Sequence, residues 1–177
     1  AGSRISDLSR WLGGYSKLVR AMPNTPALIG AGMTGMLAHP DVSEAERLGA
    51  DRVLQAVGDT IWVTEEAQID AVTAISGSGP AYVFLFIEAL QQAATELGFS
   101  DKQARRLSIE TVLGAAKLAA QSDEPASTLR ERVTSKGGTT EAALRVMAEH
   151  KVKEGIMAGA LAANERSAQL GELLGQD

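Results

Sequence analysis

The residues with the clearest chemical potential lie between two predicted helices in the carboxyl-terminal half of the chain. The segment Thr134–Glu141 reads Thr-Ser-Lys-Gly-Gly-Thr-Thr-Glu: two adjacent glycines flanked by hydroxyl residues and followed by a helical pattern. Such a turn directs backbone N–H groups and the positive end of a helix dipole at one small volume. It is suited to bind a carboxylate or a phosphate. The competing interpretation is a structural hinge with Ser and Thr as ordinary helix caps.

Three further motifs stand out earlier in the sequence. Met22-Pro23-Asn24-Thr25-Pro26 is a stiff loop at the carboxyl end of a predicted strand, where α/β sheets contact ligands. Ser76-Gly77-Ser78-Gly79-Pro80 is interpreted as a tight link between helices, with Pro80 in the first turn of the second; a phosphate-binding turn is the alternative, although such turns normally follow a strand. Gly30, Gly32 and Gly35 spell a dinucleotide fingerprint, but the residues after them read as strand and turn. We therefore predict that this motif does not touch phosphate.

Other kinds of catalytic centre find little support. The chain contains no cysteine, which removes disulfides, thiolate nucleophiles and cysteine-bound zinc. His39 and His150 each lack a second ligand at metal spacing, so no metal site is predicted. No serine stands in a G-x-S-x-G elbow.

Composition indicates a soluble, cytoplasmic protein. The net charge is -5 with scattered Lys and Arg, which makes nucleic acid an unexpected partner. Polar residues interrupt every apolar run before it reaches the roughly 20 residues of a membrane span, and no signal peptide is recognised. Aromatic residues make up only 4% of the chain. The abundant Ala, Leu, Val and Ile favour closely packed helices, and small residues along the helices fit either long antiparallel packing or an interlocked dimer.

Periodicity changes near residue 65. Before it we predict strands at 17–22 and 33–38, a helix capped by Ser43 and Glu46 that Gly58 stops, and a strand at 60–64. After it every pattern is helical: 83–97, 100–120, 127–133, 140–149 and 152–170. The predicted organisation is the closing part of an α/β domain in residues 1–65, followed by an all-α domain in residues 66–177, and the chain is mostly α overall.

Taken in order, three sets of residues resemble the Δ1-pyrroline-5-carboxylate reductase family through essentially the whole chain. They are Met22–Pro26, Asp70–Thr73 with Ser76–Tyr82, and Val133–Ser135 with Gly137–Thr140. The resemblance implies a Rossmann-type nucleotide-binding domain followed by a helical dimerisation domain. It implies an oxidoreductase of proline biosynthesis that uses NADPH or NADH to reduce the C=N bond. The family's glycine-rich first turn would precede Ala1, so roughly the first third of a usual member is expected to be absent.

The resemblance also implies roles for individual residues. The substrate carboxylate would be bound by the N–H groups of Gly137, Gly138 and Thr139 and by the Ser135 hydroxyl. The Thr140 hydroxyl would meet the ring nitrogen while hydride passes from the nicotinamide to the imine carbon. Residues implied at the cofactor are Ala1, Gly2, Met22, Pro23 and Asn24.

Two positions depart from the family pattern, and one region is ambiguous. Lys136 stands where the family often has Pro, and Arg132 stands where some members have an Asn that contacts the cofactor. Either Asp123 or Glu124 corresponds to an acidic residue that faces the substrate in some relatives.

Three hypotheses remain open at this point. The first is an active reductase assembled as a homodimer or a ring of dimers, with a small-molecule substrate. The second is a catalytically inactive helical oligomerisation module that keeps the anion-binding turn. The third is another reductase built from a Rossmann domain plus helices, such as a β-hydroxyacid dehydrogenase.

Overall fold

The computed structural model describes residues 2–175. These residues separate into two compact units: 2–81 together with 157–175 form unit 1, and Tyr82–Ile156 forms unit 2. The described chain is mostly helical with one three-stranded sheet, which lies in unit 1. The predicted change from strand to helix near residue 65 is present, since β3 ends at Val63 and α3 begins at Glu66.

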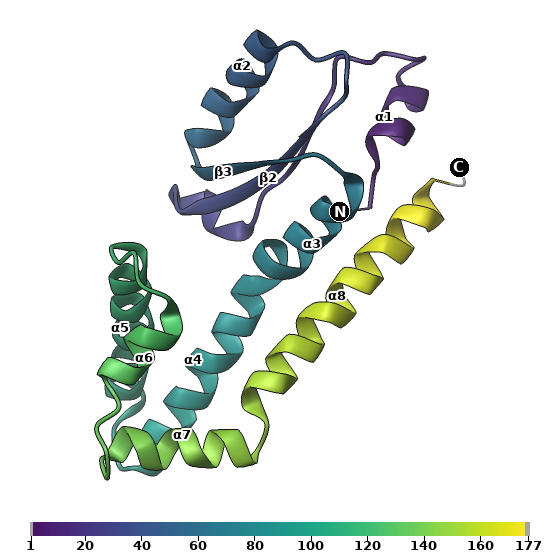
Figure 1. Cartoon of the computed structure of the whole chain (residues 1–177). Helices are drawn as coiled ribbons and strands as arrows, with labels where there is room; N and C mark the ends of the chain where they lie inside the picture. Colours follow the sequence, from purple (N-terminus) through teal and green to yellow (C-terminus); the bar gives the residue numbers. More distant parts are fainter. Residues whose placement is uncertain (1, 176–177) are drawn as a thin grey trace. The chain divides into compact units, whose positions relative to one another are not determined.

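The sheet of unit 1 has the order β1-β2-β3 (Figure 1). β1 (Val19–Met22) runs antiparallel to β2 (Gly32–Ala38), with Met22 opposite Gly35. β2 runs parallel to β3 (Gly58–Val63), with Gly32 opposite Gly58. A parallel pair needs a crossover, which is α2 (Glu44–Gln55), packed on β3. The predicted order of strand, strand, helix and strand is therefore confirmed.

The core of unit 1 lies around the central strand. β2 is buried on both faces from Thr34 to Leu37, as expected for a strand with neighbours on each side. Leu37 packs with Ile5 and Ile69, and the half-buried Met22 and Val63 lie against this cluster. The strand that ends in the Met22–Pro26 loop is thereby anchored to the buried cluster of the unit.

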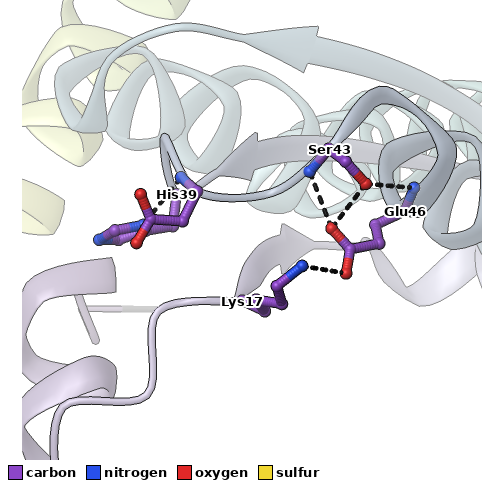
Figure 2. Close-up of polar contacts among 5 residues, drawn as sticks. Lys17, His39, Ser43 and Glu46 are labelled. Atoms are coloured by element: carbon purple, nitrogen blue, oxygen red, sulfur yellow. Dashed lines mark hydrogen bonds and ion pairs between the residues drawn. The ribbon is translucent and has the colours of Figure 1, made fainter.

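The start of α2 confirms the predicted capping box. The Ser43 hydroxyl accepts from the Glu46 N–H at 3.4 Å, and the Glu46 carboxylate accepts from the Ser43 N–H at 2.8 Å (Figure 2). Lys17 donates to the same carboxylate at 2.7 Å. The hydrogen bonds from Lys17 and Ser43 lower the pKa of Glu46 to about 2, and the Lys17 pKa is raised in return.

Unit 1 also contains a first helix that sequence patterns did not predict, α1 (Ile5–Trp11). Its first N–H, on Ile5, donates to Oε1 of Glu66 at 2.6 Å, and the other oxygen of Glu66 pairs with Arg20. Glu66 opens α3 (Glu66–Val72), and Arg20 lies buried in β1. One carboxylate thus ties together a helix start, a strand and a second helix.

The carboxyl-terminal part of α8 (Val152–Leu174) belongs to unit 1 from Met157 onward. Ser167 donates to Oδ1 of the buried Asp70 at 2.6 Å. Arg10 of α1 donates to the Gly175 carbonyl at 3.1 Å. Both ends of the described chain therefore meet in the same unit.

Unit 2 consists of helices (Figure 1), and its bounds differ from those of the predicted all-α domain at 66–177. They are most of α4 (Gly79–Glu96), α5 (Asp101–Ala120), α6 (Ala126–Arg132), α7 (Thr139–Glu149) and the first residues of α8. Ser100 and Gln103 form the predicted capping box of α5. Large apolar side chains of this unit are strongly exposed, including Leu85 at 67% and Leu97 at 80%. This unit alone does not cover its own apolar surface.

One expectation about hydropathy was wrong. The continuous helix Glu66–Glu96 contains an 18-residue window of mean hydropathy 1.3, and by length and composition it could cross a membrane. Isolated Ser, Gly and Gln residues interrupt the apolar run without lowering its average enough. Of that window, 17% is buried within the single chain.

The glycines of the apparent dinucleotide fingerprint have a structural role in and next to the sheet. Gly32 and Gly35 lie in β2, and Gly30 ends η1 (Thr25–Ile29), so no helix opens at the motif. A Cβ at Gly35 would lie 2.7 Å from Cγ1 of Val72. Gly35 therefore lets α3 approach β2 closely.

We predict that Gly35→Ala lowers the free energy of unfolding by roughly 1–3 kcal/mol through overpacking, and that cofactor affinity changes little. Urea unfolding measures the first quantity, and Gly35→Ala/Val72→Ala is the matched control that should recover stability. A large loss of cofactor affinity at unchanged stability would contradict this assignment.

Candidate functional site

The Gly-Gly turn of unit 2 opens α7, as the sequence predicted. The Gly138 N–H donates to the Ser135 carbonyl at 3.0 Å, which closes a turn with Gly137 at φ +73°. That left-handed backbone favours glycine. A Cβ at Gly138 would lie 2.5 Å from the Ser135 hydroxyl oxygen, so the second glycine is needed for close approach. Both glycines have a conformational reason that does not depend on a ligand.

The N–H groups of this turn are only partly free. The Gly137 N–H donates to Oε2 of Glu141 at 2.7 Å, and the Gly138 N–H is used in the turn. Thr139 and Thr140 are the first residues of α7, where N–H groups have no carbonyl partner inside the helix. A carboxylate is thus already bound at the predicted anion site, and it belongs to the chain itself. Sequence reasoning missed Glu141, although its position four residues after Gly137 was a usable signal.

A cavity of about 500 Å³ adjoins the turn. Gly137 and Gly138 line it together with Glu141, Ala142 and Arg145. Of the predicted substrate residues, Ser135, Thr139 and Thr140 are not among its lining. Thr140 is half-buried, whereas Ser135 and Thr139 are exposed. The lining thus includes the cation of Arg145 beside the Gly-Gly turn.

Arg132 and Glu124 form a pair that the sequence left unassigned. Arg132 donates to Oε1 of Glu124 at 2.6 Å through Nη2, and its Nη1 lies 2.5 Å from Oε2. Such a bidentate pair fixes both side chains. It connects the start of α6 to its end, while Asp123 is exposed beside it.

The predicted cofactor residues lie in unit 1. Met22 ends β1, and Pro23 is exposed directly after it. Asn24 turns its side chain inward: Oδ1 accepts from the Met33 N–H at 2.9 Å, and Nδ2 donates to the Ser76 carbonyl at 3.1 Å. The motifs at Met22–Pro26 and Ser76–Pro80, separate in the sequence, therefore meet.

Gly2 also has a packing role. Its φ is +90°, and a Cβ there would lie 2.7 Å from Cδ1 of Leu174. Gly2 is buried, which makes it a point of close contact with α8. Ala1, the other predicted cofactor residue at this end, lies outside the described residues.

Residues 66–170 match the family model described as pyrroline-5-carboxylate reductase dimerisation. The match covers more than half of the chain and includes the Gly-Gly turn and the Ser76–Pro80 motif. The chain belongs to the pyrroline-5-carboxylate reductase family. This assignment selects one of the two reductase families that the sequence left open and disfavours a β-hydroxyacid dehydrogenase.

Curated relatives and solved structures agree with the family assignment. A pyrroline-5-carboxylate reductase of Pseudomonas aeruginosa is 47% identical over 176 residues, covering 99% of this chain and 64% of the relative. One from Haemophilus influenzae is 49% identical over 152 residues, covering 85% of this chain and 56% of the relative. The chain thus spans about three-fifths of these relatives.

Two solved pyrroline carboxylate reductases share the fold closely. The enzyme of Coxiella burnetii superposes with a TM-score of 0.91 at 43% identity, covering 96% of this chain and 63% of that one. The enzyme of Plasmodium falciparum, solved with NADP bound, gives 0.88 at 32% identity, covering 96% and 68%.

Proposed function

We propose that this chain acts in the NAD(P)H-dependent reduction of Δ1-pyrroline-5-carboxylate to L-proline. The observation that carries this proposal is the Gly137–Gly138 turn at the start of α7, inside the region that matches the family. The substrate is a small anion with a polar ring nitrogen, and the turn offers an anion-binding helix start next to a threonine hydroxyl.

The substrate carboxylate is held at the start of α7, with the Thr139 N–H and the Ser135 hydroxyl as its nearest unoccupied donors. The Gly137 N–H becomes available when Glu141 moves away, and Arg145 four residues further along the helix offers Glu141 an alternative partner. The Thr140 hydroxyl donates to the imine nitrogen. The nitrogen takes a proton from solvent as the imine carbon takes hydride from the nicotinamide, which balances the reduction of C=N to CH–NH.

The residues that the resemblance implies at the cofactor could contact the nucleotide through their backbone atoms. Met22 ends β1, Pro23 and Asn24 follow it directly, and Pro23 is exposed there. When bound, NADPH or NADH supplies the hydride. The chain's own contribution is orientation and electrostatic stabilisation. A Rossmann-type arrangement of the complete nucleotide domain is part of this proposal.

Assembly as a homodimer is the second part of the proposal. The matched family model is that of a dimerisation domain, and unit 2 leaves Leu85, Leu97 and Leu113 exposed. An open hollow of about 570 Å³ beside α5 is lined by Phe99, Gln103, Arg106, Leu107, Glu110 and Thr111. A second copy that covers these faces would also account for the apolar helix Glu66–Glu96 in a cytoplasmic enzyme.

The function is tested by comparing the 177-residue chain with a version that is extended at its amino terminus. The extension is the corresponding amino-terminal segment of the Pseudomonas aeruginosa relative. Proline-forming oxidation of NADPH with pyrroline-5-carboxylate by the extended protein supports the proposal, and its absence in a folded protein overturns it. An extended protein that binds NADPH, next to an exact chain that only dimerises, identifies the exact chain as an oligomerisation module.

Gly114→Leu should weaken the dimer. Gly114 lies in the middle of α5, and a Cβ there meets nothing within 4 Å in the single chain, so a leucine fits the monomer and obstructs close helix packing between copies. We expect at least a tenfold rise in the dimer dissociation constant by sedimentation. Gly49→Leu, on the open side of α2, is the matched control. Equal dimerisation of the Gly114 variant and the unmodified chain would contradict the assignment.

A further inference from the structure

A missing hydrogen-bond donor lies at the start of α4. Pro80 is the second residue of this helix, and proline has no backbone N–H. In a regular helix the N–H of residue 80 would donate to the carbonyl of residue 76. The Ser76 carbonyl therefore cannot receive that bond. The segment η2 (Thr73–Gly77) is a π-helix, in which the Ser78 N–H donates five residues back to the Thr73 carbonyl at 2.8 Å.

Asn24 supplies the missing donor from a different part of the chain. Its Nδ2 donates to the Ser76 carbonyl at 3.1 Å and lies 3.3 Å from the Ser76 hydroxyl oxygen. The Ser76 hydroxyl in turn donates to the Met33 carbonyl at 3.3 Å. The Asn24 amide thus supplies the Ser76 carbonyl with the donor that Pro80 lacks.

The same amide also extends the sheet. β1 ends at Met22, so the Met33 N–H of β2 lies beyond the last residue pair of the β1–β2 ladder. Oδ1 of Asn24 accepts this N–H at 2.9 Å. Asn24 therefore uses both ends of its amide within unit 1. Both ends of the amide already have partners in the sheet and in the π-helix.

A packing contact links the π-helix to Met22, the first residue of the Met22–Pro26 loop. A Cβ at Gly77 would lie 2.9 Å from Cε of Met22, so the last residue of β1 rests on the π-helix. If Ser76 and Gly77 shift when the Asn24 donor is lost, the backbone against which the Met22 side chain packs shifts with them. We therefore expect the positions of the Met22–Pro26 loop and the π-helix to be coupled.

We propose that Asn24 is a positioning residue: its amide replaces the N–H that Pro80 lacks, and it thereby fixes the Met22–Pro26 loop for cofactor binding. The part that concerns the cofactor rests on the proposed function. The part that concerns Pro80 does not, because it is a statement about unit 1 alone. Asn24→Ala leaves the Ser76 carbonyl without its donor, whereas adding Pro80→Ala restores an N–H at position 80.

The stability test is a double-mutant cycle on the 177-residue chain, read as the midpoint of thermal unfolding. Asn24→Ala should lower Tm by roughly 5 °C. Pro80→Ala should lower Tm in the unmodified chain, because proline at the first helical turn is favourable, but raise it in the Asn24→Ala background. Pro40→Ala is the control and should have the same effect in both backgrounds. Equal effects of Pro80→Ala in the two backgrounds would overturn the proposal.

The cofactor test uses the extended protein and equilibrium titration with NADPH. Asn24→Ala should raise the dissociation constant by roughly tenfold with kcat changed less than threefold, and Asn24→Ala/Pro80→Ala should recover at least threefold of the affinity. No recovery would show direct contact between Asn24 and the cofactor and overturn positioning. An unmodified protein that binds no NADPH would overturn both the proposed function and the cofactor role, while the thermal cycle still decides the link to Pro80.

Discussion

Thr140→Val should lower kcat by roughly ten- to a thousandfold, the range expected when one preorganised donor is removed. The imine nitrogen gains electron density as hydride arrives, so a donor held there stabilises the transition state more than the bound substrate. Thr140 is the second residue of α7 and half-buried, directly after the Gly137–Gly138 turn. Val keeps the branched shape and removes only the hydroxyl. Steady-state kinetics of the extended protein measures the effect.

Thr139→Val is the matched control for this experiment. It has the same chemistry and lies one residue earlier in the same helix turn, but its assigned contribution is a backbone N–H that survives the substitution. We expect a smaller loss of kcat and little change in NADPH affinity for either variant. Equal activity of Thr140→Val and the unmodified protein would remove Thr140 from the catalytic role.

Gly58→Ala should destabilise unit 1 by roughly 3–5 kcal/mol, the combined cost of a strained backbone and an overpacked contact. Gly58 has φ +150°, and a Cβ there would lie 2.1 Å from the carbonyl oxygen of Gly32. That oxygen belongs to the first residue of β2, which is paired with Gly58 across the parallel ladder. Because the obstructing atom is backbone, the clash cannot be relieved by a side-chain rotation.

Urea unfolding monitored by circular dichroism measures the Gly58 effect. Gly49→Ala is the control: Gly49 lies inside α2, nothing approaches its Cβ position within 4 Å, and alanine there should stabilise by roughly 0.5–1 kcal/mol. If Gly58→Ala unfolds at the same urea concentration as the unmodified chain, the tight β2–β3 junction is not as described.

Elements with local signals were predictable from the sequence. The caps at Ser43 and Ser100 marked the starts of α2 and α5, and the β-branched run at 60–64 marked β3. α1 was missed because it is only seven residues long and has no side-chain cap. It depends on Glu66 and Gly175, which are 61 and 165 residues away from their partners in α1. No local pattern reports such contacts.

The site was predictable in outline and not in its hydrogen bonds. The two glycines and the following helix were correctly located, because turn residues and helix starts have local rules. The bond from Gly137 to Glu141 was not predicted, because the capping-box pattern has Ser or Thr three residues before the Glu and Gly138 stands at that position. Asn24 was interpreted as a cofactor contact, and only the fold shows that its partners are Ser76 and Met33. The assigned roles of Ser135, Thr139 and Thr140 remain predictions.

The way unit 1 is assembled sets an order of events during synthesis. Unit 2 is inserted in the sequence between the two segments of unit 1. The hydrogen-bond partner of Asp70, Ser167, lies 97 residues later in the chain. A ribosome has therefore finished the whole of Tyr82–Ile156 before the helix that covers Asp70 emerges. The sheet can form early, but its closing contacts come last. Until then the Asp70 carboxylate lacks the hydrogen bond from Ser167, and unit 1 lacks the helix segment from Met157 onward.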